Sequence, residues 1–62
     1  MDLKNIRTRR ELTQKELSKK SGIAQSTIHY LEAGEQSPTE RTIKKLAKAL
    51  EIDIADLLRS DG

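Results

Sequence analysis

The amino-acid sequence predicts an all-α fold of five short helices, and three observations carry this prediction. Apolar residues recur at helical spacing, most clearly within residues 43–50, where they occupy positions i, i+3, i+4 and i+7. Residues that stop helices, namely Gly22, Gly34 and Pro38, divide the chain into short segments. A length of 62 residues suits one packed layer of helices, so we expect a single domain over residues 1–62.

Composition narrows the classes of protein to consider. The chain has no Cys, which removes disulfides and thiolate metal sites and suits a cytoplasmic protein. No apolar run approaches the roughly 20 residues that a membrane span needs. His29, the single histidine, has no second His, no Cys and no paired acid at metal-ligand spacing. We therefore expect no metal, no cofactor and no membrane partner.

Charged side chains are unevenly distributed along the chain. Residues 1–20 contain seven Lys or Arg and three acids, residues 21–38 contain no Lys or Arg, and residues 39–62 contain five of each sign. A basic segment beside a neutral polar one fits phosphate attraction next to a surface that reads bases. A net charge of +2 does not decide the matter, because most runs of charge are solvated helix faces.

The first predicted helix begins near Asp2 and turns Leu3 and Ile6 inward, since these two residues lie one turn apart. Asp2 suits the positive end of the helix dipole, and the three arginines between residues 7 and 10 suit the negative end. This role at the helix end explains part of the arginine cluster without any ligand.

The second predicted helix starts at a capping box. Thr13 is the N-cap, and Glu16 follows three residues later, so each side chain can satisfy a backbone N–H of the first turn. Gln14 then occupies the first helical position, where a side-chain amide beside free N–H groups can bind a phosphate. An ordinary exposed Gln is the alternative. The helix ends at Gly22, which can adopt the left-handed conformation.

The third predicted helix spans about residues 25–33. Ile28 and Leu31 face inward at helical spacing, so uncharged polar side chains lie on the opposite side. Such side chains can form hydrogen bonds with base edges, although an ordinary amphipathic helix with a solvent-exposed side would show the same pattern. Two helices joined at Gly22 form a helix-turn-helix over about residues 13–33, whose second helix can enter the major groove of DNA.

The last two helices follow the loop 35–38. Thr39 is the expected cap of the fourth helix, and Asp53 that of a short fifth helix, whereas the tail 60–62 should fray. Apolar spacing across every segment predicts a core of Leu3, Ile6, Leu12, Leu17, Ile23, Ile28, Leu31, Ile43, Leu46, Ala47, Leu50 and Leu57.

One pattern now spans most of the chain. It consists of Thr13, Gln14, Leu17, Gly22, Ile23, Ile28, Leu31, Glu32, Gly34, Pro38, Ile43, Leu46, Ala47, Ala49 and Leu50. This pattern resembles the Cro and phage-repressor (Xre-like) helix-turn-helix family over residues 3–58. The resemblance implies a compact five-helix, lambda-repressor-like domain that binds double-stranded operator DNA as a transcriptional regulator, with a repressor favoured. It also implies a palindromic operator and a homodimer on DNA, while the free chain is compatible with a monomer.

The resemblance also assigns roles to individual residues. Gln25, Ser26 and Tyr30 of the recognition helix 25–33 match family positions that contact bases, and His29 is added as a base-reading candidate because it also points away from Ile28 and Leu31. Gln14, Thr27 and Arg41 match family positions that contact the DNA backbone, and Thr13, the N-cap beside Gln14, is added as a backbone candidate. Arg7 and Glu32 match an Arg–acid pair that ties the first helix to the third. For Tyr30, the residues alone leave open whether the ring is half buried or free to contact DNA.

Some positions depart from the family pattern. Ser18 replaces a small apolar residue, so its hydroxyl needs a partner, and Ala24 replaces the usual Ser or Thr cap of the third helix. Glu11 and Glu51 stand where Gly is frequent, so we expect those two helix ends to close differently. These changes affect local stability rather than the class of protein.

Two other classes of function are alternatives to DNA binding. The chain has no thiol, no Gly-rich phosphate loop and no cluster of metal ligands, which argues against an enzyme. An antitoxin-type or protein-interaction module built on the same fold stays open as an alternative. Affinity that falls with rising salt would favour DNA, because phosphate contacts release counterions. The family type implies a prokaryotic or phage-type regulator located in the cytoplasm.

Overall fold

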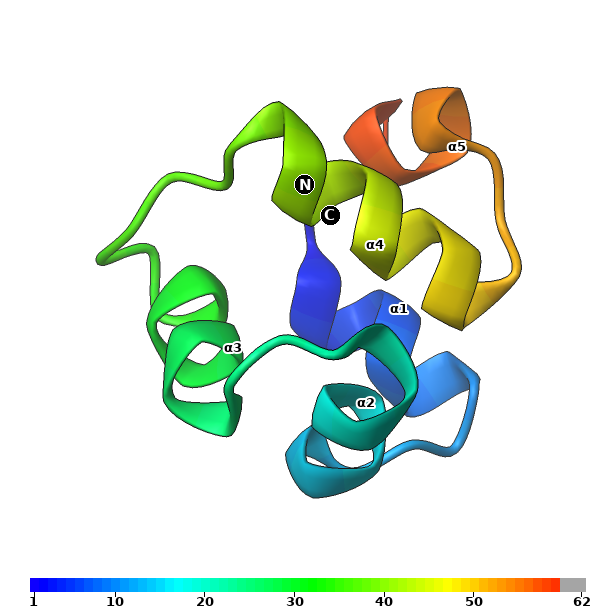
Figure 1. Cartoon of the computed structure of the whole chain (residues 1–62). Helices are drawn as coiled ribbons and strands as arrows, with labels where there is room; N and C mark the ends of the chain where they lie inside the picture. The colour runs from blue at the N-terminus through cyan, green and yellow to red at the C-terminus, as the bar shows by residue number, and fades with distance from the viewer. Residues whose placement is uncertain (60–62) are drawn as a thin grey trace.

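The computed structural model describes residues 1–59, so the tail expected to fray lies outside the described residues. Five helices are present, which confirms the predicted all-α class: α1 (Leu3–Arg9), α2 (Gln14–Ser21), α3 (Gln25–Glu32), α4 (Glu40–Leu50) and α5 (Ile54–Arg59). Helix α3 packs against α1 and α2, and α4 packs against α2 and α5. Consequently α3 stands at one edge of the molecule, with its outer side free of other helices (Figure 1).

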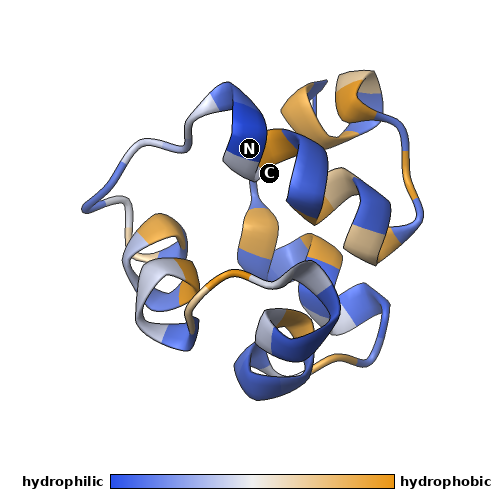
Figure 2. Ribbon diagram, viewed as in Figure 1, coloured by the Kyte–Doolittle hydropathy of each residue, from blue (hydrophilic) through white to orange (hydrophobic). Residues whose placement is uncertain are grey.

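The core is built from leucine, isoleucine and alanine. Most of the predicted core is buried, namely Leu3, Ile6, Leu17, Ile23, Ile28, Leu31, Leu46, Ala47, Leu50 and Leu57. The prediction was wrong for Leu12 and Ile43, which are only partly buried and pack against the outside of this cluster. In Figure 2 the hydrophobic segments turn toward the space between the helices, as amphipathic helices around one core require.

Local hydrogen bonds define the helix-turn-helix. Thr13 Oγ1 accepts from Glu16 N at 3.0 Å, and Thr13 N donates to Glu16 Oε1 at 2.9 Å, which completes the predicted capping box. Gly22 ends α2 in the left-handed conformation at φ 74°. Ala24 provides no side-chain cap for α3, as expected, whereas the Ser18 hydroxyl donates to the carbonyl of Ile23. The turn is therefore fixed by Ser18 as well as by its glycine.

The ends of α1 and α4 overturn one expectation. Glu11 and Glu51 have φ of 56° and 58°, so both adopt the left-handed conformation that glycine favours. Both helix ends therefore close with the left-handed conformation that Gly would adopt, although a strained Glu stands there. Next to them, Leu12 N donates to Arg7 O at 3.1 Å, and Ile52 N donates to Ala47 O at 3.0 Å. Both turns fold an apolar side chain back onto the core, which offsets the strain.

Candidate nucleic-acid interface

Helix α3 buries one side and exposes the other. Ile28 is fully buried and Leu31 is 8% exposed, so both anchor the helix in the core. Residues four apart share a side of a helix, and the opposite side is exposed at all four positions assigned to base contacts: Gln25, Ser26, His29 and Tyr30. The structure therefore brings these four residues together on one surface, which we call the reading surface.

Tyr30 projects from the reading surface rather than into the core. It is 45% exposed, so close to half of its surface is open to solvent. Its ring lies edge-on to that of His29, with the ring centroids 5.5 Å apart and the planes at 62°. This geometry is a favourable aromatic arrangement, so each ring limits the orientation of the other.

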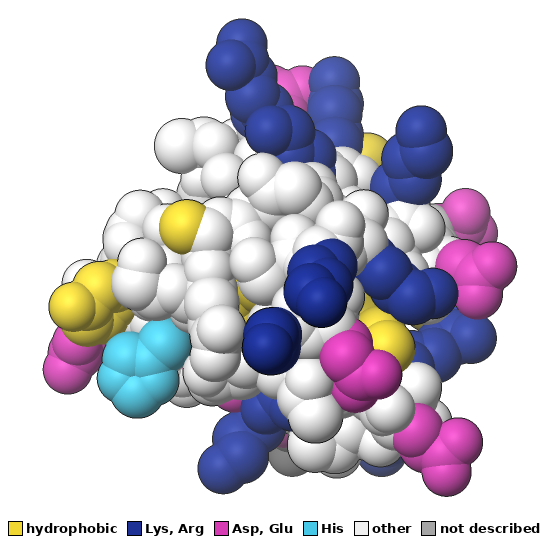
Figure 3. All heavy atoms as spheres, turned by 60° about the horizontal axis from the view of Figure 1, so that its bottom comes forward, with side chains coloured by type: hydrophobic (Ala, Val, Ile, Leu, Met, Phe, Trp, Pro, Cys, Tyr) yellow, Lys and Arg dark blue, Asp and Glu magenta, His cyan; other side chains and the backbone are white. Residues whose placement is uncertain are grey.

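Formal charge surrounds the reading surface instead of lying on it. Glu32 is the one acidic residue of α3, and its side chain is only 5% exposed. In the space-filling view of Figure 3, white uncharged surface lies to one side of the histidine and hydrophobic and acidic side chains to the other, while Lys and Arg side chains project at the top, centre and bottom of the view. Neutral polar groups with cations nearby suit a duplex, because base edges need hydrogen bonds whereas phosphates need positive charge.

Arg7 and Glu32 form an ion pair between α1 and α3. Arg7 Nε donates to Glu32 Oε2 at 2.6 Å, and Arg7 Nη2 donates to Glu32 Oε1 at 3.0 Å. A third bond runs from Arg7 Nη1 to the carbonyl of Leu12 at 2.8 Å, in the connection between α1 and α2. Both side chains are nearly buried, so this pair fixes the start of α2 and the end of α3 relative to α1.

Gln14 joins the same network. Its Nε2 donates to Glu32 Oε1 at 3.0 Å, so the side chain is half buried and held rather than loosely exposed. Burial alone would raise the pKa of Glu32, but hydrogen bonds from Arg7 and Gln14 outweigh it and leave that pKa below its usual value. The hydrogen bond to Glu32 raises the pKa of Arg7. The carboxylate therefore stays ionised and keeps Gln14 in position.

The remaining predicted contacts occupy three separate places. Thr13 is exposed at the start of α2, where the first backbone N–H groups of a helix lack partners within it. Thr27 is half buried on α3. Arg41 is exposed in the first turn of α4, across the 33–39 connection from α3 (Figure 1). Lys4 was not predicted, yet it lines a shallow hollow together with Gln14 and His29.

Known proteins are similar to this chain in sequence. A family model described as Helix-turn-helix matches residues 3–57. The chain is 36% identical over 59 residues to an HTH-type transcriptional regulator of Archaeoglobus fulgidus, with 95% of this chain and 84% of that protein covered. It is also 41% identical over 53 residues to the HTH-type transcriptional regulator y4dJ of Sinorhizobium fredii, covering 86% of this chain and 69% of that protein.

A phage protein is similar as well. The transcriptional repressor RstR of the cryptic phage CTXphi of Vibrio cholerae is 36% identical over 56 residues, or 90% of this chain. The chain spans only half the length of that repressor. Together these matches confirm the resemblance to the phage-repressor type: the chain belongs to the helix-turn-helix family of DNA-binding transcriptional regulators.

Residues 1–59 lack two other kinds of feature. None of the helices in this range has the length and apolar character to cross a membrane. Within the same range, no group of three or more His, Cys, Asp or Glu side chains is arranged to hold a metal ion.

Proposed function

We propose that this chain represses transcription by binding a specific operator sequence, with α3 inserted in the major groove. The observation that carries the proposal is the two-sided character of α3, which is anchored by Ile28 and Leu31 and exposes an uncharged polar surface. A helix fits the major groove, where every base pair presents a distinct hydrogen-bonding pattern. The repressor role is supported by similarity to the protein named as the phage repressor RstR.

The reading surface supplies the chemistry for base recognition. Gln25 begins α3, and its amide can both donate to and accept from adenine. Ser26 can donate or accept, while Tyr30 and His29 offer rings with polar edges. Residues in the first turns of a recognition helix reach deepest into the groove. We assign the strongest sequence preference to Gln25 and Ser26, with Tyr30 and His29 contributing further along the helix.

Residues at the borders of the reading surface are assigned to contact the phosphates of the DNA backbone. Gln14 uses one amide hydrogen for Glu32, and a primary amide has a second one, which is available to a phosphate. Thr13 and the first N–H groups of α2 lie beside it, at the positive end of the helix dipole. Thr27 and Arg41 would contact the strand on the α3–α4 side. These contacts set register and general affinity, not sequence preference.

Helix α5 supports a homodimer on a palindromic site. Ile54 and Leu58 are 39% and 51% exposed, and their spacing sets them on one side of the helix. A symmetric contact through these two residues would hold two copies of α3 against two half-sites. The apolar patch is small, so we expect a monomer in free solution and a dimer on DNA. We also propose a cytoplasmic location, where the DNA of a prokaryotic host or phage lies.

Selection of bound duplexes from a random pool tests this function. The expected result is an enriched pair of inverted half-sites whose centres lie about 10 base pairs apart. Affinity for the selected duplex should fall steeply with rising salt. A pool without enrichment, together with salt-independent binding, would contradict the proposal and favour the protein-interaction alternative.

A further inference from the structure

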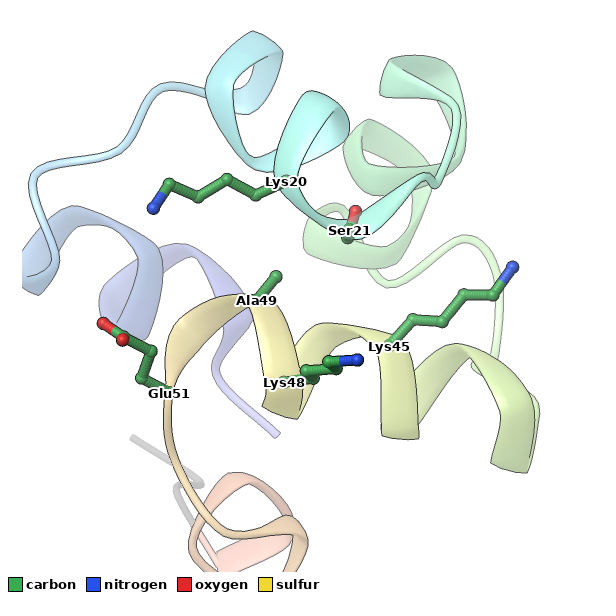
Figure 4. Close-up of a pocket in the computed structure, with 6 residues that line it drawn as sticks. All are labelled: Lys20, Ser21, Lys45, Lys48, Ala49 and Glu51. Carbon is green, nitrogen blue, oxygen red and sulfur yellow. The ribbon is translucent and has the colours of Figure 1, made fainter.

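Three lysines outside the reading surface gather between α2 and α4. Lys20 lies in the last turn of α2, and Lys45 and Lys48 lie one turn apart on α4. They line a shallow hollow, in which Lys20 and Lys45 extend toward opposite ends and Lys48 lies between them (Figure 4). We call these three residues the basic ridge.

The positive charge of the basic ridge is poorly compensated. Among residues 1–59, no ion pair includes Lys45 or Lys48, whereas the neighbouring Lys44 pairs with Glu40 at 3.3 Å. Glu51 is the one acid that lines the hollow, and it lies at the Lys20 end (Figure 4). Like charges one helical turn apart repel each other, so the folded chain keeps an arrangement that an external anion would stabilise.

The basic ridge continues from a residue already assigned to the DNA backbone. Arg41 and Lys45 line one common hollow on α4, and Lys45 also lines the hollow of the ridge. Arg41, Lys45 and Lys48 follow one another at i, i+4 and i+7, which is one side of a helix. At about 1.5 Å per residue this side extends roughly 10 Å, a length over which a DNA strand carries several phosphates.

We propose that the basic ridge binds the phosphate backbone of duplex DNA flanking the operator, beyond the base pairs that α3 reads. This inference rests on the proposed function, because a duplex must already lie against Arg41. The ridge would add affinity that depends on the length of the flanking duplex but not on its sequence, since phosphate contacts carry no direct sequence information.

The chemistry of the hollow favours nucleic acid over an acidic protein segment. Besides its lysines, the hollow is lined by Ser21, Ala49 and Glu51, so it offers no large apolar or aromatic anchor. Protein interfaces concentrate their binding energy in such anchors, whereas a phosphate backbone needs only cations and hydrogen-bond donors. The lysines supply both.

Duplex length provides the test. Affinity is measured by fluorescence anisotropy at several salt concentrations for the selected operator alone and for the same operator extended by one helical turn of random sequence on each side. We expect the extended duplex to bind more tightly and to show a salt slope steeper by about two to three units for each bound chain, at roughly 0.9 unit per phosphate contact. The variant K20Q/K45Q/K48Q should lose this difference while keeping its affinity for the short duplex.

A charge-matched control separates the ridge from net charge. The variant R9Q/R10Q/R59Q removes the same number of positive charges at exposed positions away from the hollows of α4, and circular dichroism checks that both variants fold. Retention of the length dependence in the ridge variant, or its equal loss in both variants, would overturn the inference. Binding of poly-glutamate through the ridge lysines without any length dependence would also overturn it, in favour of an acidic protein partner. If the wild-type chain shows no preference for the short operator, the proposed function itself fails, and the inference falls with it.

Discussion

Gln14 and Arg7 donate to the same atom, Glu32 Oε1, each at 3.0 Å. One carboxylate therefore links the amide proposed to contact a phosphate with the helix proposed to contact bases. Glu32 is too buried to touch DNA itself, with only 5% of its side chain exposed. The relative position of the two kinds of contact is thus set by a residue that acts entirely from within the domain.

This arrangement predicts strong coupling between Arg7 and Glu32 in stability. Replacing either residue alone by Ala should lower the free energy of unfolding by about 3–5 kcal/mol, because an unpaired charge stays buried. The double replacement should cost clearly less than the sum of the two. Urea unfolding of a double-mutant cycle measures the coupling. The exposed pair Arg59–Asp56 is the matched control, with about 1 kcal/mol or less expected. Additive losses at Arg7 and Glu32 would contradict the prediction.

The depressed pKa of Glu32 predicts a defined acid sensitivity. Its pKa is lower in the folded chain than in the unfolded chain, where it is about 4.3, so the ionised form stabilises the fold above that pH. The contribution is lost as the pH falls from there through the folded pKa. Urea midpoints measured between pH 7 and pH 3 should therefore drop more in the wild type than in Glu32→Gln.

Glu16 needs its own control in that experiment. The backbone N–H of Thr13 donates to the Glu16 carboxylate and lowers its pKa as well. The variant Glu16→Gln should therefore also show a smaller fall of the urea midpoint at acid pH. Glu16 is exposed, and solvent screening limits its effect. If the urea midpoint falls equally with pH in the wild type and in Glu32→Gln, the buried carboxylate does not govern acid stability.

The left-handed residues predict that glycine stabilises the fold. Substitution of Glu11 or Glu51 by Gly relieves backbone strain of roughly 1–2 kcal/mol but costs about 0.5–1 kcal/mol of chain entropy. We therefore expect a net gain in stability of up to about 1.5 kcal/mol. In a domain of this size 1 kcal/mol shifts Tm by about 4–8 °C. Gly22→Ala should shift Tm in the opposite direction, since it forces a side chain into φ 74°. A lower Tm for Glu51→Gly would refute the strain argument.

Residues that contact bases and residues that contact the DNA backbone should affect binding differently. Gln25→Ala should cost about 1–3 kcal/mol on the selected operator and flatten the preference at one or two base positions. Arg41→Ala should weaken binding to all sequences alike and reduce the salt slope by about one unit. Titrations against matched and scrambled duplexes at several salt concentrations distinguish the two. Equal losses of Gln25→Ala on both duplexes would show that Gln25 does not read bases.

Helical periodicity predicted most residues that face the core within helices, although Ile43 near the start of α4 is only partly buried. Leu31 and Leu46 are buried as their spacing requires, but Leu12 follows a helix, where the period carries no information. Glycine propensity misjudged Glu11 and Glu51, because packing of the next apolar residue on the core overrides local preference. Tertiary burial, not local strain, decided these turns.

The candidate DNA interface could also be predicted only in part from the sequence. The exposed side of α3 follows from periodicity, so Gln25 and Ser26 could be located from the sequence, whereas the exposure of Tyr30 could not. The bond between Gln14 and Glu32 joins residues 18 apart on different helices, and no periodicity encodes how two helices pack. The basic ridge did leave a signal, since Arg41, Lys45 and Lys48 repeat at helical spacing, but Lys20 joins them only in three dimensions.

Because the core contains no aromatic residue, Tyr30 is the sole source of ultraviolet fluorescence in the chain, which has no Trp and no Phe. Its emission comes from the reading surface rather than from the interior. Stacking or contact with bases would quench it, whereas contacts confined to the basic ridge would leave it bright. The unlabelled protein thus carries its own optical probe, positioned to tell engagement of the groove from simple electrostatic adsorption.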